Sequence, residues 1–108
     1  MSPFLRAKVD TNHPEIVSAL RTHPNVTVCS LAALGGGVPD LMIGCCGVTV
    51  LAEIKYEKEK LNPMQTRWHK AWRGTPVVVL RDVGSAHQLI ANIQKARQVF
   101  GTFHTGIE

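Results

Sequence analysis

The sequence lacks any long hydrophobic run. No stretch approaches the ~20 consecutive apolar residues that a membrane-spanning helix needs, and the N-terminus, Met1 to Arg6, lacks the apolar core of a signal peptide. The chain has only three cysteines and no C-x-x-C pair, which argues against both a disulfide framework and a zinc site. We therefore expect an intracellular protein with reduced thiols and no membrane segment.

Internal repeats, linkers and low-complexity tracts are also absent. The 108 residues should form one domain, 1–108, with flexible ends at 1–11 and 101–108. The net charge is +4 and the pI about 9.3, which favours a polyanionic partner without requiring one. A local group of basic residues lies around and just after the centre of the chain, at Lys55, Lys58, Lys60, Arg67, Lys70 and Arg73.

The stretch 38–56 carries the most informative pattern. Two runs rich in β-branched residues are separated by a short turn at Cys45–Gly47, which predicts a β-hairpin. Side chains alternate along a strand, so Glu53 and Lys55 should point the same way, roughly 6–7 Å apart, with Asp40 roughly opposite Glu53. Two carboxylates and an ammonium would then converge on one face. Such charges are costly in low dielectric unless paired or bound to metal, and carboxylate oxygens suit Mg²⁺ or Mn²⁺.

Hydrophobic periodicity places the other elements. The order of elements is helix, three strands, helix, strand, helix, and it predicts a small α/β domain whose mixed sheet includes a parallel strand–helix–strand unit. N-capping side chains mark the helix starts, and Gly74 should end the second helix as its C′ residue. The expected helices are 12–22, 62–73 and 85–100, with N-caps Asn12, Asn62 and Ser85, and the expected strands outside the hairpin are 25–34 and 76–80.

A sequence signature in the hairpin resembles that of a known family. Pro39-Asp40, twelve further residues and then Glu53-Ile54-Lys55 resemble the motif of the PD-(D/E)xK nuclease superfamily. The resemblance extends over residues 12–93. It is closest to small phage and bacterial members of the VRR-NUC and Holliday-junction-resolvase-like type, because of Gly35–Gly37 before the motif and the segment Leu61–Gln65 after it, followed by Trp68 and Trp72.

The resemblance implies an αβββαβ restriction-endonuclease-like core with helices flanking a mixed central sheet. It also implies a Mg²⁺- or Mn²⁺-dependent endonuclease that hydrolyses DNA phosphodiester bonds, with branched or junction DNA as a candidate substrate. The protein would act as a homodimer in a bacterial or phage-infected cell's cytoplasm. One alternative is an inactive module of the same fold that binds nucleic acid or protein. Another is a structural domain in which Glu53 and Lys55 form a surface ion pair on an exposed sheet face.

The same resemblance implies roles for individual residues. Asp40 and Glu53 would be metal ligands together with the backbone carbonyl of Ile54, and Lys55 would position the attacking water and stabilise phosphate charge. Glu15 either caps its own helix or completes the metal site. Gln65 either caps the second helix or points into the site. Phosphate contacts are expected from Lys58, Lys60, Arg67, Lys70, Gly36 and Gly37.

Three further side chains in the second helix have two interpretations. Trp68 and Trp72 share a stripe at helical spacing with Met64, which favours a core position over a base-stacking role. His69 is expected at the surface or in packing rather than as a ligand. The mixed-charge run 56–60 is expected to be a solvated loop.

Overall fold

The structure is a computed structural model that describes residues 13–100. It is a small α/β domain with a four-stranded mixed sheet, as the periodicity predicted. The expected flexible ends at 1–11 and 101–108, and the N-cap at Asn12, lie outside the described residues. The elements are α2 (His13–Arg21), β1 (Val26–Ser30), the 3-10 turn η1 (Ala32–Leu34), β2 (Leu41–Cys45), β3 (Val48–Ile54), α3 (Pro63–Ala71), β4 (Val78–Leu80) and α4 (Val83–Phe100).

The strands lie in the order β1-β2-β3-β4. β1 pairs with β2 and β2 with β3 in antiparallel fashion, whereas β3 and β4 are parallel. The parallel pair confirms the strand–helix–strand unit, in which α3 lies on the connection between β3 and β4.

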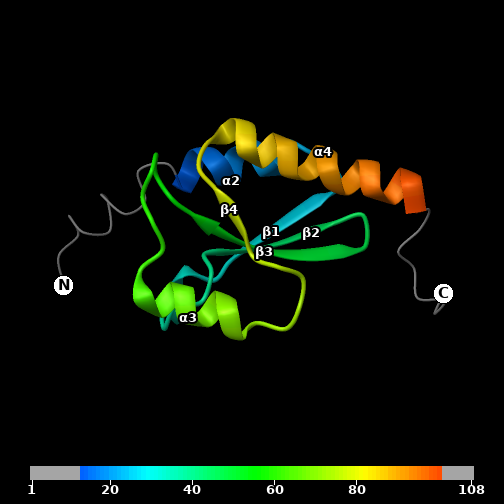
Figure 1. The fold of residues 1–108 in the computed structure, drawn as a ribbon. Helices are drawn as coiled ribbons and strands as arrows, with labels where there is room; N and C mark the ends of the chain where they lie inside the picture. Colours follow the sequence, from blue (N-terminus) through cyan, green and yellow to red (C-terminus); the bar gives the residue numbers. More distant parts are fainter. Residues whose placement is uncertain (1–12, 101–108) are drawn as a thin grey trace.

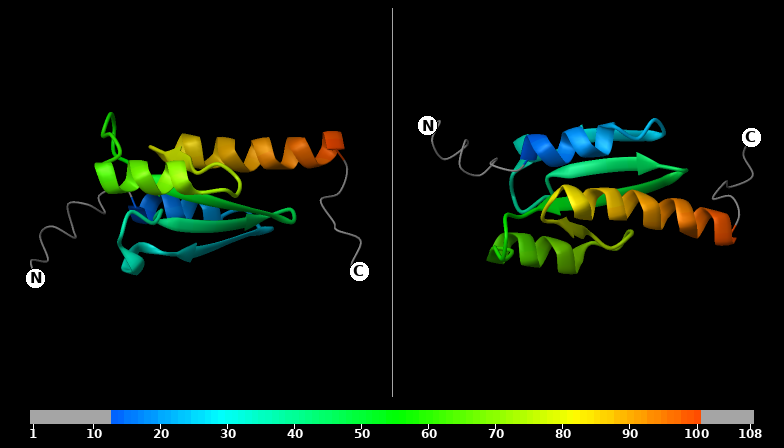
Figure 2. Two further views of the ribbon diagram at one scale, coloured as in Figure 1. Left: turned by 60° about the horizontal axis from the view of Figure 1, so that its bottom comes forward. Right: turned by 90° about the horizontal axis from the view of Figure 1, so that it is seen from above.

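The helices cover the two faces of the sheet unequally. α2 and α4 lie side by side on one face, and α3 lies on the other, near the end of the sheet where β2 begins and β3 ends (Figures 1 and 2). Within residues 13–100, no helix combines the length and apolar character needed to cross a membrane. The core between the sheet and the two-helix layer includes Ile16 and Leu20 of α2, Leu41 and Ile43 of β2, Val50, Ala52 and Ile54 of β3, Leu80 of β4, and Ala86, Ile90 and Ile93 of α4.

The β2–β3 hairpin sets the register that matters for the site. Cys45 pairs with Val48 across a two-residue turn in which Cys46 and Gly47 have φ angles of 57° and 81°. Two positive φ values suit the right-handed twist of paired strands. The register continues to Leu41 opposite Ala52 at the far end of the ladder. The residue before Leu41 therefore lies beside the residue after Ala52.

The second face of the sheet is only partly covered. Leu51 is buried there, apart from the main core cluster, whereas Met42 on the neighbouring strand is exposed. An open hollow of about 230 Å³ on this face is lined by Thr27, Val28, Cys29, Met42, Gly44 and Thr49. α3 thus covers the end of the sheet that carries Glu53 and leaves this hollow open.

Two expected boundaries were wrong for local reasons. The strand expected over 25–34 ends at Ser30, because the Ala32 N–H bonds to Ser30 Oγ and the chain turns through η1. The last helix begins at Val83 rather than Ser85. Asp82 Oδ1 accepts the Ser85 N–H at 2.7 Å, and Ser85 Oγ accepts the Asp82 N–H at 3.1 Å, so Asp82 is the capping residue.

Replacing Gly37 with alanine should lower the free energy of unfolding by about 2 kcal/mol or more. Gly37 has a φ of 86°, and a Cβ there would lie 2.5 Å from the Met64 carbonyl oxygen of α3. Gly84→Ala is the matched control, because Gly84 lies in the first turn of α4 with space around it and should be neutral or slightly stabilising. Urea unfolding of both variants measures the difference. Equal effects at the two positions would contradict the close packing of Gly37 on α3.

Candidate metal centre

Asp40 lies immediately before β2, next to the end of β3. Its Oδ2 atom accepts a hydrogen bond from the Ile54 backbone N–H at 2.8 Å. Because Leu41 pairs with Ala52, this position lies beside Glu53 on the neighbouring strand. The buried Pro39 precedes it. The sequence prediction that Asp40 lies opposite Glu53 is therefore confirmed by the register.

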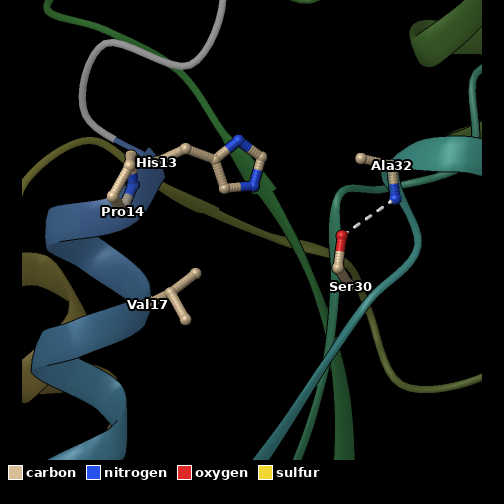
Figure 3. Close-up of a pocket in the computed structure, with 5 residues that line it drawn as sticks. All are labelled: His13, Pro14, Val17, Ser30 and Ala32. Atoms are coloured by element: carbon tan, nitrogen blue, oxygen red, sulfur yellow. Dashed lines mark hydrogen bonds between the residues drawn. The ribbon is translucent and has the colours of Figure 1, made fainter.

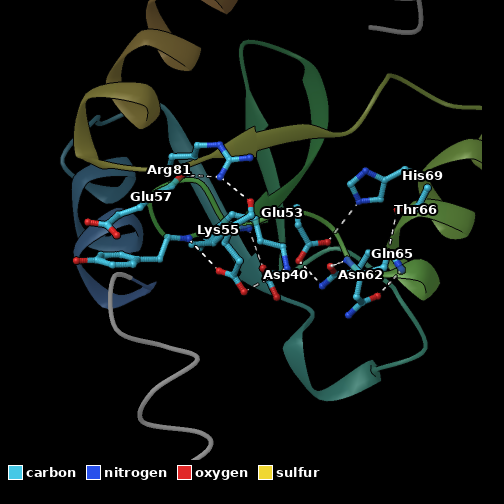
Figure 4. Close-up of polar contacts among 12 residues, drawn as sticks. Asp40, Glu53, Lys55, Glu57, Asn62, Gln65, Thr66, His69 and Arg81 are labelled. Carbon is cyan, nitrogen blue, oxygen red and sulfur yellow. Dashed lines mark hydrogen bonds and ion pairs between the residues drawn. The ribbon is translucent and has the colours of Figure 1, made fainter.

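Glu53 is a buried carboxyl group, with only 1% of its surface exposed. Gln65 Nε2 donates to its Oε2 at 3.2 Å, and His69 Nε2 lies 3.4 Å from its Oε1 (Figure 4). Burial raises the pKa of Glu53 to about 9, and hydrogen bonding to Asp40 and the charge of Asp40 add to the rise. Lys55 opposes this rise only in part. At neutral pH, without a cation, Glu53 therefore holds a proton.

Lys55 is buried on the same side as Glu53. The backbone N–H of Lys55 donates to the Leu80 carbonyl at 3.0 Å, and this hydrogen bond anchors the backbone to β4. Its ammonium lies 3.7 Å from Glu59 Oε2, and its charge acts on both Glu53 and His69. The burial of Glu53 and Lys55 contradicts the alternative in which they form an ion pair on an exposed sheet face.

Gln65 fulfils both roles that the sequence left open. Its Oε1 accepts the Asn62 N–H at 2.9 Å and its N–H donates to Asn62 Oδ1 at 2.8 Å, which completes a capping box. Its side-chain amide nitrogen, Nε2, donates a hydrogen bond to Glu53 Oε2. The cap of α3 therefore fixes the orientation of a side chain that contacts the candidate site.

His69 was not predicted as a site residue. It is partly buried, and its pKa is lowered by burial and by the positive charge of Lys55, so the ring is neutral at physiological pH. It lies one helical turn after Gln65 on the same face of α3. The i, i+4 spacing of Gln65 and His69 was the available sequence signal, because it places both side chains toward the sheet.

The loop 56–60 is exposed, as predicted, but it is also tied to the site. Glu59 Oε1 accepts the Tyr56 N–H at 3.1 Å while its Oε2 pairs with Lys55. Arg81 donates to the carbonyls of Glu57 and Glu59, each at 2.7 Å. Glu59, which was not among the predicted site residues, thus pairs with the Lys55 ammonium.

Asn62→Ala should cost about 1 kcal/mol of stability, because it removes the oxygen that caps α3. It should also release Gln65 from its fixed orientation toward Glu53. Urea unfolding measures the first effect. Thr66→Ala is the control, since it removes only the side-chain hydroxyl that donates to the Asn62 carbonyl and leaves the capping box intact. If Asn62→Ala is no more destabilising than Thr66→Ala, the capping box does not stabilise the helix.

Other predicted site residues lie further from these contacts. Glu15 is exposed in the first turn of α2, and no hydrogen bond or ion pair within residues 13–100 joins it to Asp40 or Glu53. Gly36 is exposed with open space around it, whereas Gly37 packs against α3. The basic residues expected to contact phosphate are all exposed: Lys58 and Lys60 in the loop before α3, and Arg67 and Lys70 on α3 itself.

The expectation that Trp68 and Trp72 belong to the core was wrong. α3 has no buried residue, Trp68 is only half-buried and Trp72 is 40% exposed. Their rings are stacked on each other, with centroids 5.0 Å apart and an angle of 16° between planes. The prediction that Gly74 ends α3 was also wrong, because the helix ends at Ala71. Gly74 instead packs against Trp72, and a Cβ at this position would lie 2.7 Å from the Trp72 ring.

The carboxyl groups fit a hard divalent cation. Asp40 and Glu53 are oxygen donors on neighbouring strands, with Glu53 buried and Asp40 partly buried. Burial and the nearby Asp40 raise the pKa of Glu53, so ionising both acids there is unfavourable without a cation. The Ile54 carbonyl is the third donor expected from the sequence. Among residues 13–100, no three His, Cys, Asp or Glu side chains are grouped as metal ligands. Two carboxylates suit Mg²⁺, which usually keeps several of its own waters.

Comparison with protein-family models gives no match. Comparison with curated protein sequences gives none either.

A separate hollow of about 280 Å³ lies between the start of α2 and the end of β1 (Figure 3). It is lined by His13, Pro14, Val17, Ser30 and Ala32, and the His13 side chain projects toward Ser30 and Ala32. The lining contains no carboxylate, which separates this hollow chemically from the site at Asp40 and Glu53.

Proposed function

We propose that this domain is a metal-dependent endonuclease that hydrolyses DNA phosphodiester bonds with Mg²⁺ or Mn²⁺. The observation that carries the proposal is the close placement of Asp40 and Glu53, with Lys55 buried beside them. A buried acid and a buried amine beside a second, partly buried acid have no packing advantage over apolar side chains of similar volume. Its chemistry instead matches cation binding next to a phosphate.

In this proposal, each residue has a distinct task. Asp40, Glu53 and the Ile54 carbonyl would hold the cation, which would supply Lewis-acid activation of a water and neutralise charge on the phosphate. Lys55 presents its ammonium to the scissile phosphate and to the attacking water. Glu59 positions that ammonium through the ion pair at 3.7 Å.

Two residues of α3 orient the Glu53 carboxyl group rather than react. Gln65 donates to Glu53 Oε2, which leaves the other carboxyl oxygen beside His69. Because the His69 ring is neutral, it can accept or donate one proton in a hydrogen bond without adding charge to the site. Both contacts restrict the rotation of a carboxyl group that would otherwise turn freely.

The experiment is cleavage of supercoiled plasmid and of branched DNA in Mg²⁺, Mn²⁺ or EDTA. Wild type should cleave only with metal, and Asp40→Asn and Glu53→Gln should be inactive. Glu57→Gln is the matched control, because it removes an exposed carboxylate from the neighbouring loop. DNA binding without cleavage under every metal condition would favour the alternative, an inactive binding module of the same fold.

Partner and location belong to the same proposal. We expect two copies to act together so that both strands are engaged, in the cytoplasm of a bacterial or phage-infected cell. Sedimentation equilibrium with and without DNA measures the oligomeric state. A protein that stays monomeric on cleavable DNA would contradict the homodimer and leave the chemistry of the site untouched.

A further inference from the structure

We propose that the stacked Trp68–Trp72 pair is a binding site for an unpaired nucleobase. The inference rests on the proposed function, because it makes the substrate a DNA with a single-stranded segment beside the cleaved bond. The ligand class is therefore a single strand, a flap or a splayed junction rather than uninterrupted duplex.

The pair is rigid before any ligand arrives. Trp72 Nε1 donates a hydrogen bond to the Thr75 carbonyl at 3.0 Å, and one side of its ring stacks on Trp68. Gly74 lies against the edge of the same ring, where any larger residue would collide. An aromatic ring that is fixed and still 40% exposed loses little conformational freedom when a base stacks on it.

The pair lies on and directly after α3, the helix whose His69 contacts Glu53 of the candidate metal centre. Trp68 directly precedes His69 in α3, and residues adjacent in a helix project about 100° apart. His69 contacts Glu53, so the tryptophan stripe borders the stripe that faces the carboxyl groups. A DNA strand with a base stacked on Trp72 would extend to the candidate metal centre within a few nucleotides.

The charge around the pair favours a polyanion over a protein partner. From Lys60 to Arg81 the sequence contains five Lys or Arg residues and no Asp or Glu. Arg67, Lys70 and Arg73 are exposed on α3 and just after it. Aromatic rings among cations form the usual surface for single-stranded nucleic acid, in which bases stack and phosphates pair with basic side chains. A second copy of this chain would bring the same positive charge to the interface and be repelled.

The test compares two DNA strands of identical charge. Wild-type protein in EDTA is titrated with a 12-nucleotide oligo-dT and with an abasic strand of the same length. Binding is followed by quenching of tryptophan fluorescence, which reports only on this pair because the chain has two tryptophans. Fluorescence anisotropy of labelled DNA repeats the titration for the variants.

We expect oligo-dT to bind about tenfold more tightly than the abasic strand, the effect of one stacked base. Trp72→Ala and Trp72→Leu should lose this preference, and Trp72→Phe should keep most of it. Arg67→Ala should weaken the binding of both DNA strands equally. Lys95→Ala, on the exposed side of α4, should bind like wild type. Thermal melts of each variant confirm that it is folded.

Equal affinity for the two strands would overturn the proposal, as would no binding of either. A shift from dimer to monomer in Trp72→Ala would also overturn it, because a second copy would then occupy the pair. Failure of the nuclease proposal is distinguishable: a protein that prefers oligo-dT but cleaves no DNA with any metal retains the base site and loses the enzyme. A protein that cleaves DNA with metal but binds both DNA strands equally would support the nuclease proposal and overturn the base site.

Discussion

Replacing Lys55 with methionine should slow DNA cleavage about 100-fold or more while leaving the Mg²⁺-dependent rise in melting temperature intact. Methionine keeps the length of the side chain and removes its charge. The two carboxyl groups would still hold the cation, but the scissile phosphate would lose the ammonium that stabilises its developing charge. Losing one fixed donor of this kind typically costs about 100-fold or more in rate. Single-turnover cleavage and thermal melts with and without Mg²⁺ measure the two effects separately.

Two variants define the limits of this prediction. Asp40→Asn should lose both cleavage and the Mg²⁺-dependent stabilisation, because the stabilisation comes from a site present only in the folded protein. Lys95→Met removes an exposed charge on α4 and should behave like wild type in both assays. If Lys55→Met cleaves at the wild-type rate, the role assigned to Lys55 is wrong.

Without metal, the protein should become less stable as the pH rises from about 7 to about 8.5. Burial raises the pKa of Glu53 to about 9 from an ordinary value of 4.5, so between these values the folded state binds a proton that the unfolded state has released. Stability therefore falls as pH rises, by up to about 1.4 kcal/mol per pH unit for one group. Urea unfolding in EDTA at several pH values measures the slope.

Two other groups, His69 and Cys45, limit the pH range in which Glu53 determines how stability changes with pH. The pKa of His69 is lowered, so its contribution makes stability rise with pH, and this ends near its ordinary value of 6.5. Burial raises the pKa of Cys45 to about 11, which makes stability fall again above about pH 9. Between the two ranges Glu53 should dominate the slope.

Glu53→Gln should flatten the slope between pH 7 and 8.5, and the exposed control Glu57→Gln should preserve it. Mg²⁺ should offset the loss in wild type, more strongly at pH 8.5 than at pH 7, because the cation binds the ionised acids. A slope that survives in Glu53→Gln would show that another group causes it.

The strand pattern and the position of the acids could be predicted from local sequence. Alternation places Glu53 and Lys55 together, and the short Cys46–Gly47 turn fixes the register that brings Asp40 beside Glu53. These features depend on the two-residue period of a strand and on turn chemistry, both of which are local.

Other features depend on contacts that the pattern does not contain. The stripe of Met64, Trp68 and Trp72 has the spacing of a core helix, but α3 lies at the rim of the sheet and leaves it exposed. The contact of His69 with Glu53 depends on where α3 settles against β3, and the pairing of Glu59 with Lys55 depends on the fold of the 56–60 loop. Both contacts depend on how the elements pack in the fold, and the periodicity of the sequence does not predict that packing.

The most direct test of the site is diffraction from crystals soaked in Mn²⁺, recorded where manganese scatters anomalously. We expect one strong anomalous peak within bonding distance of both the Asp40 and the Glu53 carboxyl groups, absent from crystals of Asp40→Asn. A protein that takes up Mn²⁺ only elsewhere, or none at saturating concentration with both acids intact, would contradict it.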